Sequence, residues 1–247
     1  MISRDKKKII IIIPARLESK RLPNKVLKII DGEPMIVKVA KKSKNLNVGD
    51  VVVASGNEEI CKVLNKFNIK NVLTSKNHKS GTDRVYEAFK KICEDENELI
   101  INIQGDLPYF SDSLIFSIIE LMKNKNVDIG SAVCGLEQNE LNDFNVVKAE
   151  VVFKNKFGYA TNFLRETDHF TNLYHHIGIY AFRPYTLKKF VNLKQTQEEV
   201  SRGLEQMRAL NNNMKIGLVK VSNNPVSIDS IDDLKKIRLL LRKNLIN

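Results

Sequence analysis

The sequence contains few cysteines: Cys61, Cys93 and Cys134 are the only three, and they lie far apart. Their spacing fits no zinc-binding pattern, and an odd number argues against a framework of disulfide bonds. We therefore expect each cysteine to be a small core residue. A reducing compartment suits free thiols, so the cytoplasm is the predicted location.

Long apolar runs are also absent. The run that follows the basic start of the chain, residues 9–13, has five isoleucines, whereas a membrane span needs about 20 apolar residues. No small-residue cleavage site follows this run, so a short basic tail is expected in place of a signal peptide. No membrane partner is predicted.

The chain is basic, with a net charge of +11. The lysines are spread along the whole sequence, and aromatic residues do not alternate with them as a nucleic-acid stacking surface would require. Nucleic acid is therefore not expected as a partner, although a basic nucleic-acid-binding protein remains a distant alternative hypothesis. The charge does favour attraction of a small polyanionic substrate.

Strands alternate with helices through the first half of the chain, which is typical of a parallel sheet covered on both faces. The predicted strands are 9–13, 51–54, 71–73, 99–103 and 129–134, and the predicted helices are 35–43, 58–67, 83–93 and 113–123. The pattern then changes to strands at 146–153, 159–163, 177–182 and 215–221, a polar loop at 168–174, and helices at 185–191, 198–210 (interrupted by Gly203) and from 230. We expect one α/β domain over residues 1–247, with an inserted mixed α/β segment at about 140–195.

The loop after the first predicted strand is strongly cationic. It carries two prolines and four cations: Pro14, Pro23, Arg16, Lys20, Arg21 and Lys25. Arginine offers forked donors to phosphate oxygens, lysine offers a compact charge, and backbone N–H groups near Ala15 and Leu17 can add to a phosphate cradle. A solvated basic loop is the alternative, and the two prolines argue against it because such a loop needs no fixed backbone.

Two aspartates occupy positions that suit a metal ion. Asp106 follows Gln104 and Gly105 at the end of a predicted strand, where open α/β sheets bind their ligands. Asp229 lies just before the last predicted helix, whose first turn Ser230 can cap as part of an approximate capping box with Asp233. The two carboxylates are candidates to share one Mg²⁺, which prefers oxygen ligands; a turn residue and a helix cap are the alternatives.

Two further segments carry polar side chains. Ser80 or Thr82 can cap the helix at 83–93, and Arg84 lies one turn into it, where it can face a nucleotide. His176 and Tyr180 are four residues apart, so in a strand they share one face. With Glu205 and Gln206 they would form a polar pocket for a hydroxyl-rich sugar, although a lone histidine is more often structural.

In order along the chain, these segments resemble the motifs of the 3-deoxy-manno-octulosonate (Kdo) cytidylyltransferases, or CMP-Kdo synthetases. The motifs read PARLESKRLPNK, HKSGTDR, NIQGD, HHIGIY, LEQMRAL and IDSIDDL. The acylneuraminate cytidylyltransferases share the first motif but typically lack the second and fifth. The resemblance implies a nucleotide-diphospho-sugar transferase fold, Rossmann-like with three layers, a mixed and mainly parallel sheet, and an inserted segment through which a homodimer forms.

The resemblance also implies roles for individual residues. The nucleotide-binding residues would be Pro14, Ala15, Arg16, Ser19, Arg21, Lys25, Ser80, Arg84, Gln104 and Asp106. Asp106 and Asp229 would hold Mg²⁺, and together with Arg16 and Lys25 they would form the catalytic set. The Kdo-binding residues would be Arg165, His176, Tyr180, Glu205 and Gln206.

The implied reaction transfers CMP from CTP to Kdo and releases pyrophosphate, for lipopolysaccharide biosynthesis. A cytidylyltransferase for another acidic sugar, 8-amino-Kdo or a relative of sialic acid, is the nearer alternative. The sequence departs from the family pattern at several positions: Leu107 replaces a glutamate, Val26 a proline, Leu164 a small polar residue, Phe182 a tyrosine and Arg202 a glutamate. The segment between Arg165 and His175 is also short. The change at Leu107 removes one carboxylate near the expected metal.

Overall fold

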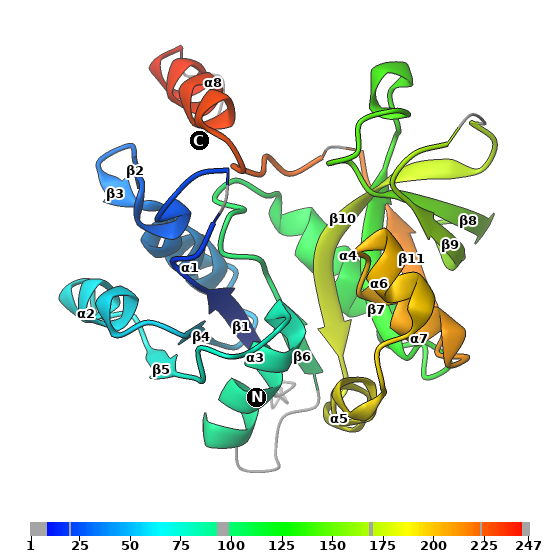
Figure 1. Cartoon of the computed structure of the whole chain (residues 1–247), viewed down its shortest axis with the longest axis horizontal. Coiled ribbons are helices and arrows are strands. Elements are labelled where there is room, and N and C mark those ends of the chain that lie inside the picture. Colours follow the sequence, from blue (N-terminus) through cyan, green and yellow to red (C-terminus); the bar gives the residue numbers. More distant parts are fainter. Residues whose placement is uncertain (1–8, 20, 93–98, 168–169, 223, 244–247) are drawn as a thin grey trace, which may run out of the picture. The chain divides into compact units, whose positions relative to one another are not determined.

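Figure 1 shows the computed structural model, which describes residues 9–19, 21–92, 99–167, 170–222 and 224–243. The chain divides into two compact units. Unit 1 comprises Met1–Phe110 and Pro225–Asn247, and unit 2 comprises Ser111–Asn224. Unit 2 contains the whole segment predicted as an insertion and extends beyond it on both sides. The single-domain description stays a prediction.

Unit 1 is built on a parallel sheet in the order β5-β4-β1-β6. Its strands are β1 (Ile9–Ala15), β4 (Asp50–Ser55), β5 (Asn71–Leu73) and β6 (Leu99–Asn102). Every residue of β1 and β6 is buried, which requires cover on both faces of these strands and explains their continuous apolar sequences. Helices α1 (Met35–Asn45), α2 (Glu58–Lys66) and α3 (Gly81–Ile92) pack on this sheet.

Residues from both ends of the chain complete unit 1. Helix α8 (Ile231–Arg242) buries Leu234 and Ile237 in one cluster with Leu22, Ile30 and Met35. Helix α8 thus packs beside the loop that follows β1, and the two share one hydrophobic core.

A short hairpin precedes α1 and was missed from the sequence. Strands β2 (Ile29–Ile30) and β3 (Glu33–Pro34) pair antiparallel across Asp31 and Gly32, whose φ angles are 49° and 78°. Two consecutive positive φ angles define a type I′ turn, for which Asp-Gly is a strong signal. A 3₁₀ turn, η1 (Lys25–Leu27), comes just before this hairpin.

Unit 2 contains a mixed sheet in the order β10-β7-β11-β9-β8, in which β8 also pairs with β10. The strands are β7 (Ile129–Cys134), β8 (Lys148–Lys154), β9 (Phe157–Leu164), β10 (Leu173–Phe182) and β11 (Ile216–Lys220). Only β7 and β11 run parallel among the pairs of this unit's described residues. The helices are α4 (Asp112–Leu121), α5 (Pro184–Asn192), α6 (Gln197–Arg202) and α7 (Gln206–Asn211), with a 3₁₀ turn η2 (Gln138–Glu140).

The interruption predicted at Gly203 is confirmed, and one other prediction of local structure in unit 2 was wrong. The helix predicted at 198–210 divides into two helices, because Gly203 adopts the left-handed conformation (φ 62°) that ends α6. The loop predicted at 168–174 gives way to β10 at Leu173, because Leu173 and Tyr174 pair with β8; residues 168 and 169 lie outside the described residues.

The cysteine predictions have mixed outcomes. Cys134 is buried, Cys61 is half-buried, and both are free thiols. Cys93 lies outside the described residues. Within the described parts of the chain, no helix has the length and apolar character needed to cross a membrane.

Candidate active site

A cavity of about 160 Å³ lies in unit 1 beside the loop that follows β1. Nine of the ten predicted nucleotide-binding residues line it, namely Pro14, Ala15, Arg16, Ser19, Lys25, Ser80, Arg84, Gln104 and Asp106. Arg21 is not among its lining residues; its guanidinium instead lies 3.1 Å from the Asp229 carboxylate. Three segments that are distant in the sequence therefore meet in one place, as expected for the carboxyl ends of neighbouring parallel strands.

Asn57 holds the start of the basic loop in place. Its Oδ1 accepts a hydrogen bond from the backbone N–H of Leu17 at 3.2 Å, and its Nδ2 donates to Glu18 at 3.4 Å. Sequence reasoning did not single out Asn57, because nothing in the sequence connects the residue before α2 with the loop after β1. Backbone and amide donors, together with Arg16 and Arg84, lower the pKa of Glu18, although burial opposes them.

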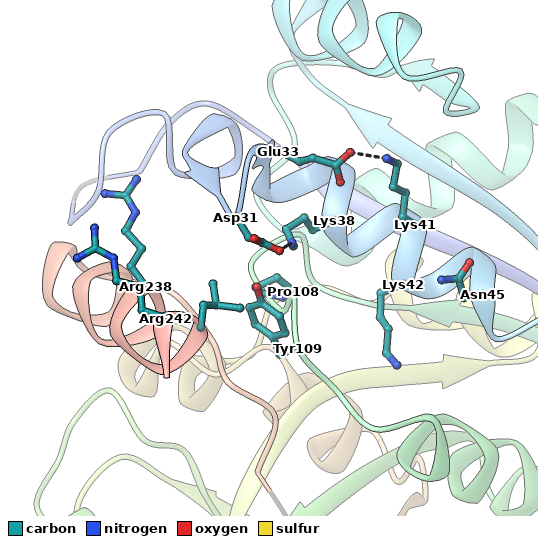
Figure 2. Close-up of a pocket in the computed structure, with 11 residues that line it drawn as sticks. Asp31, Glu33, Lys38, Lys41, Lys42, Asn45, Pro108, Tyr109, Arg238 and Arg242 are labelled. Atoms are coloured by element: carbon teal, nitrogen blue, oxygen red, sulfur yellow. Dashed lines mark hydrogen bonds and ion pairs between the residues drawn. The ribbon is translucent and has the colours of Figure 1, made fainter. Parts of the chain in front are cut away.

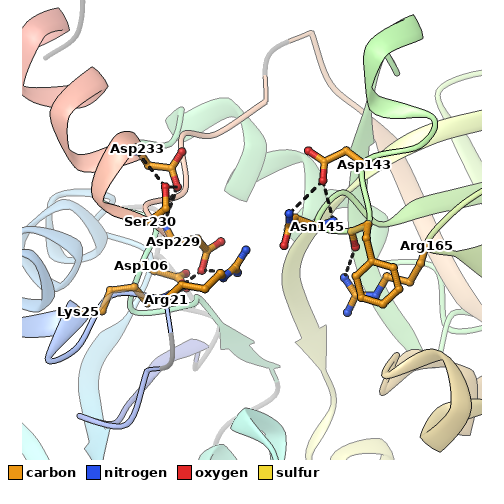
Figure 3. Close-up of polar contacts among 10 residues, drawn as sticks. Arg21, Lys25, Asp106, Asp143, Asn145, Arg165, Asp229, Ser230 and Asp233 are labelled. Atoms are coloured by element: carbon orange, nitrogen blue, oxygen red, sulfur yellow. Dashed lines mark hydrogen bonds and ion pairs between the residues drawn. The ribbon is translucent and has the colours of Figure 1, made fainter.

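The two aspartates predicted to share a metal do lie together, and Lys25 joins them (Figure 3). The Lys25 ammonium lies 2.6 Å from Asp106 Oδ2 and 2.8 Å from Asp229 Oδ1. Burial lowers the pKa of Lys25, but the two carboxylates outweigh this effect, so the pKa is raised above its ordinary value. Lys25 is therefore charged at neutral pH and partly neutralises both acids.

Backbone hydrogen bonds tie the two acidic segments to each other. The Asp106 carbonyl accepts from the N–H of Ile228 at 3.1 Å, and the Tyr109 carbonyl accepts from the N–H of Val226 at 3.1 Å. Tyr109 and Val226 thereby form an isolated antiparallel bridge. The position of Asp229 beside Asp106 thus follows from backbone pairing as well as from the ion pairs.

The cap of α8 leaves the Asp229 side chain available, as the sequence suggested. Ser230 Oγ accepts from the N–H of Asp233 at 3.1 Å, and the Asp233 carboxylate accepts from the N–H of Ser230 at 2.8 Å. These reciprocal bonds complete the capping box. Because Ser230 and Asp233 satisfy the end of the helix, the Asp229 carboxylate can point at Lys25.

A divalent cation fits the chemistry of this acidic pair. One cation of the chain, the Lys25 ammonium, already lies within 2.8 Å of an oxygen from each carboxylate, so both oxygens can reach a single ion. Mg²⁺ accepts one or two protein carboxylates and takes its other ligands from water and substrate phosphates. Among the described residues no group of three or more His, Cys, Asp or Glu side chains converges on a metal position, so a two-carboxylate site is the arrangement to consider.

The helix that follows the second motif has both predicted features. Ser80 Oγ accepts from the N–H of Asp83 at 3.0 Å and so caps α3, although Ser80 also lines the cavity. Arg84 is buried and donates to Thr74 Oγ1 at 2.6 Å and to the Ser75 carbonyl at 3.0 Å. Burial, then the nearby Arg16 charge, lowers its pKa. Arg84 therefore braces the 74–75 segment from a position in the cavity wall.

In unit 2 the residues predicted for the sugar are also close to one another. The rings of His176 and Tyr180 are 5.6 Å apart, so the two side chains share one side of β10 despite a bulge between Ile177 and Ala181. Burial, then the Glu205 charge, raises the pKa of Tyr180, and Arg165 opposes this. The charges of Glu205 and Arg165 therefore act on the Tyr180 hydroxyl in opposite directions.

Gln206 and Arg165 differ in how many hydrogen-bond partners the protein provides for their side chains. Gln206 is 6% exposed, and its Nε2 has no hydrogen-bond partner among the described residues. The Arg165 guanidinium donates to the carbonyls of Phe144 (3.1 Å), Gly203 (3.0 Å) and Arg202 (3.4 Å). Gln206 thus offers a free buried donor, whereas Arg165 must exchange backbone partners to hold an anion.

Lys148 is a buried lysine that sequence reasoning missed. Its ammonium donates to three carbonyls, those of Asp143 (2.7 Å), Val146 (2.9 Å) and Arg165 (2.5 Å). Burial lowers its pKa. By holding the Arg165 carbonyl, Lys148 anchors the backbone of a predicted sugar-binding residue.

Comparisons with known proteins agree with this geometry. A family model described as cytidylyltransferase matches residues 10–216. Two relatives named 3-deoxy-manno-octulosonate cytidylyltransferase, from Bartonella bacilliformis and Rickettsia typhi, are each 40% identical to this chain. The alignments cover 94% and 95% of this chain, and 98% and 97% of the relatives. The chain belongs to the 3-deoxy-manno-octulosonate cytidylyltransferase family.

Solved structures support the fold of this family member. A CMP:2-keto-3-deoxy-manno-octonic acid synthetase complexed with CTP is 28% identical, with a TM-score of 0.87 over 96% of this chain and 99% of that one. A putative glucose-1-phosphate thymidylyltransferase from Bacillus anthracis is 17% identical with a TM-score of 0.70, and shows the fold alone. The predicted α/β nucleotide-sugar transferase fold is confirmed.

Some lining residues of this cytidylyltransferase's cavity were not predicted: Glu18, Val26, His78, Gly81 and Gly105. Most of them sit inside the quoted motifs, so neighbouring motif positions were the signal that could have identified them. His78 pairs with Glu87. Burial raises the pKa of Glu87, but hydrogen bonds from Lys91, the Ser75 N–H and His78 outweigh it and lower the pKa to about 2. Leu107, which departs from the family pattern, is buried and adds no carboxylate, so the second acid beside Asp106 is Asp229.

His176 makes the stability of the enzyme depend on pH. Burial, then the nearby His175, lowers its pKa to about 3, and its Nε2 lies 3.0 Å from Ser131 Oγ. Below about pH 6.5 the histidine binds a proton in the unfolded chain but not in the folded chain. The free energy of unfolding therefore falls as the pH falls. We expect a loss of about 1.4 kcal/mol per pH unit from this residue between pH 6 and pH 4. Urea unfolding of wild type and His176→Gln across this range measures it, and parallel pH profiles for the two proteins would contradict the assignment.

Proposed function

We propose that the protein transfers CMP from CTP to 3-deoxy-D-manno-octulosonate and releases pyrophosphate, as a step of lipopolysaccharide biosynthesis. One observation carries the proposal: nine of the ten residues expected to bind the nucleotide line one cavity, and the two expected metal carboxylates converge at its edge. Membership of the family and the names of its relatives point to the same substrates.

The residues of unit 1 perform the nucleotide half of the reaction. Arg16 and Lys25, which both line the cavity, bind the β- and γ-phosphates and stabilise the charge that develops as pyrophosphate leaves. The anomeric hydroxyl of Kdo forms a new bond to the α-phosphorus and gives up its proton to solvent, while the bond from that phosphorus to the α,β-bridging oxygen breaks and pyrophosphate leaves. Catalysis therefore rests mainly on positioning and electrostatics, and no histidine is assigned as a general base.

Asp106 and Asp229 would hold Mg²⁺, with phosphate and water oxygens as the other ligands. When bound, the ion supplies positive charge that neutralises the phosphates and lowers the pKa of a coordinated hydroxyl. The role of Lys25 then changes, because its ammonium and the ion compete for the same two carboxylate oxygens. A displaced Lys25 is free to bind the triphosphate.

The residues of unit 2 perform the sugar half. The guanidinium of Arg165 would pair with the Kdo carboxylate, and the donors and acceptors of Tyr180, Glu205 and Gln206 would bind its hydroxyl groups. The unpartnered Nε2 of Gln206 supports this role, because a buried amide without a partner is costly unless a ligand satisfies it.

A panel of acidic sugars tests the proposal. Pyrophosphate release from CTP is measured with Kdo, 8-amino-Kdo and a sialic acid, each with Mg²⁺. The highest kcat/KM is expected with Kdo. Pyrophosphate release with another acidic sugar but not with Kdo would mean that the proposed reaction is correct and the proposed sugar substrate is wrong. Release with no sugar, combined with salt-sensitive binding of DNA or RNA, would favour the distant nucleic-acid hypothesis.

We also propose that the enzyme is a cytoplasmic homodimer that associates through unit 2. Val152 on β8 and Tyr159 on β9 are cross-strand neighbours with exposed fractions of 64% and 39%, so their pair presents apolar surface. Phe144 and Phe170 are exposed as well. Adjoining exposed apolar side chains such as Val152 and Tyr159 are a feature of association surfaces.

Val152→Lys is expected to weaken such a dimer, because it places a charge on an apolar contact surface. Sedimentation velocity at several concentrations measures the change, with Lys154→Gln on the same strand as the control. A wild-type protein that sediments as a monomer at all concentrations, or a Val152→Lys variant that dimerises as the wild type does, would contradict the proposal.

A further inference from the structure

Gly56 comes directly after β4 and packs against Arg84, which lines the nucleotide cavity. A β-carbon at position 56 would lie 2.5 Å from Nη1 of Arg84 and 3.0 Å from its Cζ. Non-bonded heavy atoms are most stable about 3.5–4.0 Å apart, so the guanidinium occupies space that any other residue at this position would fill. Among the described glycines only Gly32 and Gly203 have a positive φ. Position 56 therefore uses the missing side chain of glycine and not its backbone freedom.

The guanidinium of Arg84 is held by neutral acceptors. Its Nη1 donates to Thr74 Oγ1 at 2.6 Å and to the Ser75 carbonyl at 3.0 Å. The Thr74 hydroxyl itself donates to the Ser55 carbonyl at 3.0 Å. Because its only proton is used there, the hydroxyl oxygen meets Arg84 as an acceptor.

Figure 2 shows another cavity of unit 1, in which cations are held by carboxylates instead. Lys38 lies 2.7 Å from Asp31, and Lys41 contacts Glu33. Each of these ion pairs neutralises its cation within the protein. Within the described ranges, by contrast, no carboxylate lies within ion-pair distance of Arg84, so its neutral partners fix its orientation and leave its charge for an anionic ligand.

The backbone around Gly56 also holds the partners of this guanidinium. The Ser55 carbonyl accepts from the N–H of Thr74 at 2.8 Å as well as from its hydroxyl. The Gly56 N–H donates to the carbonyl of Ala15, at the start of the basic loop, at 3.3 Å. One stretch of backbone thus fixes the Thr74 acceptor and meets the loop that carries Arg16. All of these residues belong to unit 1.

We propose that Gly56 is a positioning residue of the nucleotide site. The space left by its missing side chain lets the Arg84 guanidinium lie against the backbone, where Thr74 and Ser75 orient it toward the nucleotide. Neither Gly56 nor Thr74 is among the lining residues of the cavity, so both act through Arg84. The inference rests on the proposed function, because it takes CTP as the occupant of this cavity.

Gly56→Ala is expected to weaken CTP binding about tenfold, the usual scale for losing a charge-assisted hydrogen bond. The added methyl group displaces Nη1 of Arg84 from Thr74. The variant is expected to stay folded, because the atoms nearest to the methyl belong to the end of a flexible side chain. Calorimetry with CTP and Mg²⁺, without a sugar, measures binding, and urea unfolding checks the fold. Thr74→Val, which removes the acceptor from the other side, is expected to cause a similar loss.

A double variant separates positioning from a general loosening of the fold. Gly56→Ala combined with Arg84→Gln is expected to bind CTP no more weakly than Arg84→Gln alone, because the guanidinium that the methyl displaces is gone. In turnover with Kdo, Gly56→Ala is expected to raise the KM for CTP about tenfold and to leave the KM for Kdo unchanged. A loosened fold would raise both.

Gly135→Ala is the matched control, because a β-carbon at Gly135 meets no atom within 4 Å. The inference is overturned if Gly56→Ala or Thr74→Val binds CTP as tightly as Gly135→Ala does. It is also overturned if the losses of Gly56→Ala and Arg84→Gln add up in the double variant. A wild-type protein that does not bind CTP would overturn the proposed function as well, whereas the other outcomes leave the proposed reaction untouched.

Discussion

Asp106→Ala and Asp229→Ala are each expected to abolish pyrophosphate release while the protein stays folded. Each change removes one of the two carboxylates that can hold the divalent cation, and a single acid cannot replace the pair. A fall of at least about 10³-fold in kcat is expected, the scale on which loss of charge stabilisation in the transition state is measured. Neither side chain is fully buried, so the fold does not depend on either.

Turnover and urea unfolding, both measured with saturating Mg²⁺, test this prediction. Asp50→Ala is the control, since it removes an exposed aspartate of unit 1 whose ion pair within the described ranges is with exposed Lys70. Near-normal turnover by either active-site variant would rule out a shared metal. Loss of the cooperative unfolding transition would instead mean that the pair is structural.

Lys25→Met is expected to cause the second largest effect, a fall of about 10²-fold or more in kcat/KM. The variant loses a cation of the phosphate cavity, and it also leaves two carboxylates facing each other without the ammonium that joins them. Like charges held close together favour any ion that binds between them. Mg²⁺ should therefore stabilise the variant more than it stabilises the wild type.

Thermal unfolding without substrates separates this effect from catalysis. The rise in Tm on adding Mg²⁺ is compared among wild type, Lys25→Met and Lys25→Arg, which keeps the charge. The largest rise is expected for Lys25→Met. An equal rise in all three proteins would show that Lys25 and the metal do not compete for the two carboxylates.

Much of unit 1 could be predicted because local sequence and burial agree there. The run Ile9–Ile13 has no alternative to a buried strand, and Ser230 with Asp233 marks the start of α8 by hydrogen bonds within one turn. The β2–β3 hairpin was missed although Asp31 and Gly32 carry a clear turn signal, because its strands are only two residues long. Short elements add little periodicity to a sequence.

The site could be predicted only in part, for a physical reason. Asp106 and Asp229 were recognised from their places at the ends of elements, and the structure brings them together. The lysine between them, and the Asn57 amide that holds the loop, are contacts between distant segments that no local pattern encodes. Gly203 was recognised as an interruption of the helix predicted at 198–210, whereas its left-handed backbone, which ends α6, became visible only in the structure.

The backbone bridge beside the two acids has a practical consequence. The N–H groups of Val226 and Ile228 donate to the carbonyls of Tyr109 and Asp106, so both amides are protected from solvent exchange only while the two acidic segments stay together. Their deuterium uptake therefore reports the assembly of the carboxylate pair in the absence of nucleotide, metal or sugar. This uptake distinguishes two kinds of inactive variant. Slow uptake at the two amides means that the acidic segments are still paired and the catalytic step itself is impaired, whereas rapid uptake means that the two segments have separated.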